Sequence, residues 1–186
     1  TMLLTALLAS CSLVGGSKDG PVIFAPDPRV EADPGWPLVN WQLSTNRPTA
    51  PSMMDSTRIA VSPVPGELQV YKGATWSQPT PDILQDAIVR TLEDSRKLAG
   101  VTRRGGGIAG DFDLAMDIRQ FDADYAGGAS PSAVIEVSTS LIHNADNRVV
   151  ATQLFRHATP AGSTAIPDVH RAFEQSLSDI TRDISG

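Results

Sequence analysis

Alternation of apolar and polar residues predicts strands in the second half of the chain. From Phe112 to Arg119, apolar side chains occupy every other position, which is the period of two expected of a half-buried strand. Residues Ala133–His143 and Arg148–Thr159 show the same alternation. Because only the turn-prone Asn144–Asn147 separates these last two segments, we predict that they form an antiparallel hairpin.

Two other segments carry their apolar residues at helical spacing. In the first, Thr80 offers a capping oxygen, Pro81 suits the first helical position and Gly100 supplies a stop. These signals predict a helix over Pro81–Ala99. The second segment lies near the C-terminus, where apolar residues recur every three or four positions from Val169 to Ile184.

Prolines dominate the segment Pro21–Pro37, which predicts an extended arm before the first strand at Leu38–Leu43. Two further β-prone runs, Arg58–Val64 and Glu67–Lys72, flank a turn at Pro65-Gly66. The order of elements predicts an α/β (α+β) fold, a mixed β-sheet with two main helices packed on it. We expect this single domain to span residues 38–186.

The N-terminal residues 1–10 form an apolar run that is shorter than the roughly 20 residues of a membrane-spanning helix. They have the length of a signal-peptide h-region, so we interpret them as a signal peptide remnant. The string Leu8-Ala9-Ser10-Cys11 then resembles the lipobox of bacterial lipoproteins. The other interpretation of Cys11 is a buried free thiol.

The lipobox resemblance implies that the mature chain begins at Cys11, which carries a diacylglycerol and an N-acyl group such as palmitate. Residues 11–37 would be the lipidated N-terminus and a proline-rich tether. In such lipoproteins an Asp after the cysteine favours the inner membrane, whereas Ser12 stands here. The resemblance therefore implies anchoring in the outer membrane, facing the periplasm, rather than in the inner membrane.

Composition narrows the class of function. The chain has 186 residues, of which 41% are hydrophobic, with 15 Lys and Arg against 21 Asp and Glu and a single cysteine. An acidic chain of this kind is a poor partner for nucleic acid, because phosphate contacts dominate non-specific affinity. One cysteine excludes an internal disulfide and a multi-cysteine metal site.

Histidines and aspartates are the candidates for chemistry. The three histidines, His143, His157 and His170, show no spacing typical of metal ligands. Five aspartates cluster in sequence, at Asp111, Asp113, Asp117, Asp122 and Asp124. Such a cluster could do acid–base work or bind a hard cation, but Asp113 and Asp117 fall on the polar face of a strand, which favours a solvated sheet edge. We expect no metal, no catalytic residue and no enzyme activity.

The segment Tyr71–Leu84 carries a resemblance to a known family. A tyrosine, a tryptophan and a proline-led helix follow one another in ABC-type transport auxiliary lipoproteins, the periplasmic partners of MCE transport systems. Tyr71, Trp76 and Pro81 match this order, and the likeness extends from about Trp41 to Ile184. Tyr71 and Trp76 are therefore candidates for partner contact or for packing.

The family resemblance implies a non-catalytic protein without a cofactor. Its partners would be an MCE-domain protein and an ABC permease and ATPase, which move phospholipid or other hydrophobic compounds between the inner and outer membranes. The resemblance also implies a homo-oligomeric ring. Three alternatives stay open. The first is an unrelated outer-membrane lipoprotein that acts as an assembly factor, the second is a small-molecule binding module, and the third is an enzyme.

Overall fold

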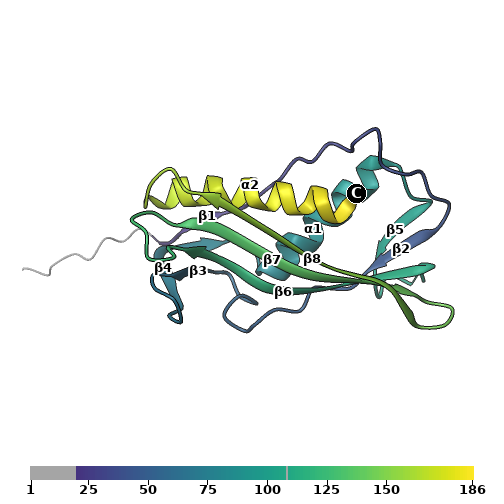
Figure 1. Ribbon diagram of the computed structural model, residues 1–186, viewed down its shortest axis with the longest axis horizontal. Helices are drawn as coiled ribbons and strands as arrows, with labels where there is room; N and C mark the ends of the chain where they lie inside the picture. The colour runs from purple at the N-terminus through teal and green to yellow at the C-terminus, as the bar shows by residue number, and fades with distance from the viewer. Residues whose placement is uncertain (1–19, 108) are drawn as a thin grey trace, which may run out of the picture.

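The computed structural model describes residues 20–107 and 109–186 (Figure 1). Cys11 and the predicted signal peptide remnant thus lie outside the described residues. Eight strands form one mixed sheet in the described part of the chain, and two helices pack on it, as the sequence predicted. The elements are β1 (Val22–Phe24), β2 (Gln42–Thr45), β3 (Arg58–Ser62), β4 (Gln69–Trp76), α1 (Thr80–Ser95), β5 (Gly100–Arg103), β6 (Phe112–Asp124), β7 (Ser132–His143), β8 (Arg148–Pro160) and α2 (Ile166–Ser185).

Strand β6 is the centre of the sheet. On one side it pairs antiparallel with β7, which pairs antiparallel with β8. On the other side its first half pairs in parallel with β2 and its last residues pair in parallel with β3. β2 continues to β5, and β3 continues to β4 and β1. The long strands β6 to β8 curve beneath α2 in Figure 1.

The predictions for the second half of the chain are confirmed. β7 and β8 form the expected hairpin across Asn144–Asn147. Helix α2 contains the predicted helical segment and ends one residue after Ile184. β6 is longer than predicted, because a register shift between Ile118 and Gln120 lets a second apolar series, which includes Phe121 and Ala123, continue the strand into the core.

The prediction for the first helix was wrong at both ends. α1 ends at Ser95 because Arg96 adopts the left-handed conformation, with φ of 54°, and its amide donates to the Glu93 carbonyl at 3.2 Å. Gly100 therefore opens β5 instead of stopping the helix. At the other end, the Thr80 hydroxyl does not cap the helix, since it donates to the Met54 carbonyl at 2.8 Å.

The proline-rich segment contributes to the sheet, contrary to the expectation of an extended arm that precedes the first strand. β1 lies inside this segment and pairs in parallel with the end of β4, from Ala74 to Trp76. Beyond β1, the carboxylate of Asp27 forms an ion pair with Arg90 on α1. The arm is thus held against the domain at both places.

The strand predicted at Leu38–Leu43 is correct only at its end, because β2 begins at Gln42. The residues just before β2 contact the end of α1 instead of pairing in the sheet. The amide of Val39 donates to the Lys97 carbonyl at 2.8 Å, so this part of the chain crosses the end of α1 before it enters the sheet. As a result, side chains of the arm face the ends of the helices.

One hydrophobic core joins the sheet to both helices. Trp76 is its largest member and only 2% of it is exposed. Its ring meets Phe121 of β6 and Phe173 of α2 edge-on, with ring centroids 6.2 and 5.2 Å apart. Phe121 and Phe173 stack on each other at 5.3 Å. This aromatic cluster fixes α2 to the middle of the sheet.

Candidate functional site

The two residues singled out by the family resemblance lie in different environments. Trp76 is in the core described above, so its position is that of a packing residue. Tyr71 lies on the same strand but is half-buried, and burial raises the pKa of its phenol. Its hydroxyl is therefore neutral at physiological pH. Tyr71 remains a candidate for partner contact or packing.

The expectation of a solvated edge was wrong for Asp113, because β6 is the central strand, and Asp122 of the same cluster is buried too. Asp113 is 4% exposed, pairs with Arg104 and accepts a hydrogen bond from the Asn144 amide at 2.9 Å. Asp122 is 2% exposed and accepts a hydrogen bond from the Ser62 hydroxyl. Asp117 is exposed as predicted. Among the described residues, no three His, Cys, Asp or Glu side chains are placed to hold a metal ion.

Replacing Asp122 with asparagine is expected to stabilise the protein at pH 7. Burial raises the pKa of Asp122 above its usual value, so the charged form is disfavoured in the folded state. The gain should be about 1 kcal/mol, the size of a typical penalty for an imperfectly satisfied buried group. It should shrink as the pH falls through the raised pKa, because Asp122 then becomes neutral in the folded protein.

Thermal unfolding of both proteins between pH 8 and pH 4.5 would measure this dependence. The control is Asp117→Asn on the same strand, which removes an exposed charge, keeps an oxygen that can accept the hydrogen bond of the Thr49 hydroxyl, and should leave the midpoint at pH 7 nearly unchanged. A variant less stable than the wild type at pH 7 would show that the hydrogen bonds from Ser62 and Gln120 to the Asp122 carboxylate, with the attraction of Arg156, outweigh its burial.

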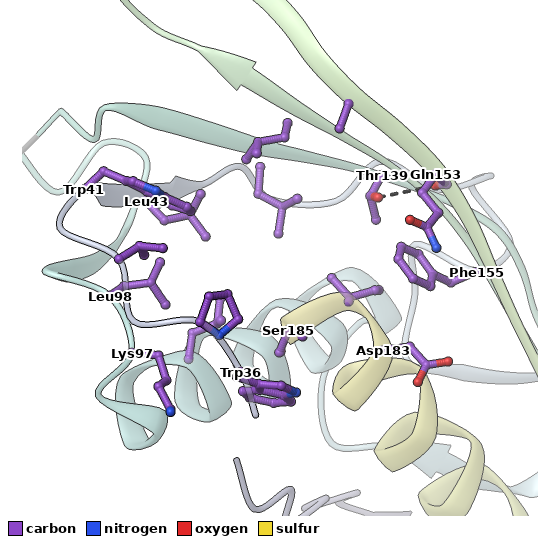
Figure 2. A pocket seen from close by; sticks show the side chains of 18 residues that line it. Trp36, Trp41, Leu43, Lys97, Leu98, Thr139, Gln153, Phe155, Asp183 and Ser185 are labelled. Atoms are coloured by element: carbon purple, nitrogen blue, oxygen red, sulfur yellow. Dashed lines mark hydrogen bonds between the residues drawn. The ribbon is translucent and has the colours of Figure 1, made fainter. Parts of the chain in front are cut away.

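An apolar cavity of about 290 Å³ lies between the sheet and the C-terminal ends of both helices (Figure 2). The sheet supplies one wall, with Leu43 of β2, Leu114 of β6, Leu141 of β7 and Phe155 of β8. Because neighbouring strands present these side chains on one face, the wall is continuous. We call this space the helix-end cavity.

The proline-rich arm and the helix ends line further sides of the helix-end cavity, which is partly open to solvent. Trp36 and Trp41 line it from the segment before β2, and Leu98 lines it from the connection after α1. Ile184 and Ser185 line it from the last turn of α2. The crossing of the arm over α1 therefore creates this cavity, since the arm brings Trp36 to the end of α2.

The charged groups at the helix-end cavity lie at its rim. Figure 2 shows the Lys97 ammonium and the Asp183 carboxylate pointing away from its middle. Lys97 donates to the Pro34 carbonyl at 3.2 Å, and Asp183 pairs with His157 at 2.8 Å. The polar side chains left in the lining are uncharged, and they include Gln153 and Ser185. Such an interior suits an uncharged, apolar ligand.

The family model for the ABC-type transport auxiliary lipoprotein component matches residues 22–185, from β1 to the last residue of α2. The chain belongs to this family. The resemblance inferred from Tyr71, Trp76 and Pro81 is thus confirmed, and this auxiliary lipoprotein is an accessory component of ABC-type transport. None of its described helices has the length and hydrophobicity needed to cross a membrane.

Solved structures agree with this assignment. The auxiliary lipoprotein is 47% identical to protein XCC0632 from Xanthomonas campestris, with a TM-score of 0.84, over 89% of this chain and 93% of that one. An uncharacterised protein with 12% identity has a TM-score of 0.68 over 90% and 97% of the chains. Protein CT253 from Chlamydia trachomatis, 10% identical, has a TM-score of 0.53 over 80% and 97%. The last two share the fold alone. No curated protein matches the chain.

The helix-end cavity was not predicted from the sequence, which left the presence of an apolar pocket open. Its lining residues come from segments far apart in the chain, and their convergence depends on the path of the arm. One signal was present, because Trp36 and Val39 are apolar residues within or next to a proline-rich segment that had no assigned partner. Apolar side chains in such a segment indicate that it packs against the domain.

Proposed function

We propose that this auxiliary lipoprotein is a non-catalytic component of a transport system made of an MCE-domain protein, an ABC permease and an ATPase. It helps this system move phospholipid or another hydrophobic compound between the inner and outer membranes. The family match over residues 22–185 carries the proposal. The helix-end cavity supports the hydrophobic nature of the cargo, because most of its lining is apolar and its charged side chains, Lys97 and Asp183, lie at the rim.

The proposal includes anchoring of the protein in the outer membrane, facing the periplasm. Acyl groups attached to Cys11 supply the anchor, and the proposed function uses no cofactor. Two or more chains hold a protein stably, since each buried methylene contributes about 0.8 kcal/mol. A tethered domain then meets its partners at a high effective concentration, which suits a docking role.

Homo-oligomerisation is also part of the proposal. Within the described chain, β8 pairs only with β7, so the backbone groups along its other side are available to a second copy. The strand also exposes Val149 and Leu154, which are 54% and 50% accessible. Exposed apolar residues on an open edge of 13 residues are typical of an interface.

Mass spectrometry of the full-length protein, tagged and purified in detergent from its native host, tests the proposal. We expect an acylated Cys11, co-elution of MCE-domain and ABC subunits, and, once these subunits are removed, a native mass of two or more protomers. Acylation without these partners would favour the assembly factor or the small-molecule binding module. An unmodified Cys11 would contradict the lipid anchor.

Replacing Cys11 with serine is expected to move the protein from the membrane fraction to the soluble fraction, because serine has no thiol to carry the diacylglycerol. Fractionation followed by a carbonate wash measures this change. Ser12→Ala, which keeps the thiol, is the matched control and should stay with the membrane. A Cys11→Ser protein that resists the wash would contradict the lipid anchor.

A further inference from the structure

We propose that the helix-end cavity binds one unbranched acyl chain of a membrane-derived amphiphile. The class of ligand rests on the proposed function, and the site itself rests on the lining of the cavity. Its apolar wall comes from four strands, both helix ends and the arm. Transfer of an alkyl chain from water to such a wall is favourable because the burial of apolar surface drives binding.

The size of the cavity limits the chain that it holds. A volume of about 290 Å³ equals that of about ten water molecules in the liquid, at about 30 Å³ each. A methylene group is similar in size to a water molecule, so the cavity takes about ten carbons. Longer chains then extend into solvent, and their extra methylenes add no further buried surface.

An uncharged polar group at the cavity supports a ligand that carries an oxygen. Gln153 lines the sheet side of the cavity and is exposed to solvent. Its amide nitrogen is an uncharged donor to the carboxyl or ester oxygen of an acyl group. The polar end of the ligand then lies where the cavity meets solvent, and its alkyl end lies inside.

The occupant that we propose is a separate molecule, and the acyl anchor of this chain is the competing occupant, which would have to cross the distance from β1 to the cavity. The described chain begins next to β1, where Phe24 packs on His170 in the first turns of α2, with ring centroids 4.6 Å apart. Ser185 lies 15 residues further along the same helix, which corresponds to about 22 Å. β1 and the helix-end cavity therefore lie toward opposite ends of α2 (Figure 1).

Tryptophan fluorescence offers a direct test, because Trp36 and Trp41 line the cavity whereas Trp76 does not. The protein is the full chain with Cys11→Ser, purified without detergent, and the probes are ω-bromo fatty acids of increasing length. Bromine quenches a tryptophan that it contacts. We expect saturable quenching, with an affinity that rises about fourfold per methylene up to about ten carbons and then levels off.

Ala151→Phe is the variant that fills the cavity, and Ala158→Phe on the same strand but outside the lining is its matched control. We expect affinity to fall at least tenfold in the first variant and to stay unchanged in the second. Gln153→Phe, at another exposed position of β8, provides an independent filling variant if Ala151→Phe does not fold.

Three results would overturn the acyl site. The first is the absence of saturable quenching, and the second is quenching that both filling variants retain. The third is loss of binding in the naturally acylated protein, which would assign the cavity to the anchor of this chain. None of these results bears on co-purification with transport subunits. Conversely, failed co-purification with intact quenching would remove the transport role and leave the acyl site in place.

Discussion

Replacing Trp76 with alanine is expected to lower the free energy of unfolding by about 3–5 kcal/mol, the range for deletion of a large buried aromatic side chain. Trp76 is 2% exposed and touches aromatic rings from β6 and α2. The alanine variant would leave a void where these elements meet, because close-packed neighbours relax only in part. Urea denaturation followed by circular dichroism measures the loss.

Two controls separate packing from partner contact. Trp76→Phe should keep part of the lost stability, since a smaller ring still contacts Phe121 and Phe173. Leu38→Ala should leave stability unchanged, because Leu38 is 79% exposed. If Trp76→Ala kept its stability but lost co-purification with transport subunits, Trp76 would be a contact residue.

Replacing Gly110 with alanine is expected to destabilise the protein by about 3 kcal/mol, at the upper end of the cost of overpacking. A Cβ atom at this position would lie 2.6 Å from the Ser44 amide nitrogen and 2.9 Å from the Gln42 carbonyl oxygen. Both are backbone atoms of β2 and cannot move without disturbing the sheet. The Gly110 amide also donates to the Ser44 hydroxyl at 2.8 Å, and this hydrogen bond holds the Gly110 backbone close to β2.

Thermal unfolding of Gly110→Ala and Gly162→Ala together provides the measurement for this prediction. At Gly162 the nearest atom to an added Cβ is a carboxylate oxygen of Asp168 at 3.6 Å, which is ordinary contact. The Gly162→Ala variant should therefore unfold at nearly the wild-type temperature. Equal midpoints for the two variants would mean that β2 can shift at little cost.

Elements with a local signal could be predicted from the sequence, and elements without one could not. The hairpin of β7 and β8 followed from alternation and a short turn. β1 and β5 have only three and four residues, too few to show a period, and each forms through parallel pairing with a strand far away in the sequence. Their position depends on the assembled sheet.

The same limit applies to the candidate site. Alternation showed that Asp113 lies on the face opposite Leu114, but it could not show that β6 is central or that Arg104 and Asn144 surround the carboxylate. The helix-end cavity depends in turn on Trp36, which reaches it only because the arm is held to α1. The lipobox is recognised without any fold, so the prediction for Cys11 depends on no structural element and stays a prediction.

Under the proposed anchoring at Cys11, the docking of the proline-rich segment limits how far the domain can stand from the membrane. β1 is paired with β4 and Asp27 is bound to Arg90, so the segment from residue 21 to residue 37 adds no free length. With the anchor at Cys11, the nine steps from residue 11 to residue 20 reach at most about 30 Å even when fully extended. This tether is short. Under the proposed function, the MCE-domain and ABC subunits would therefore have to span the distance to the opposite membrane.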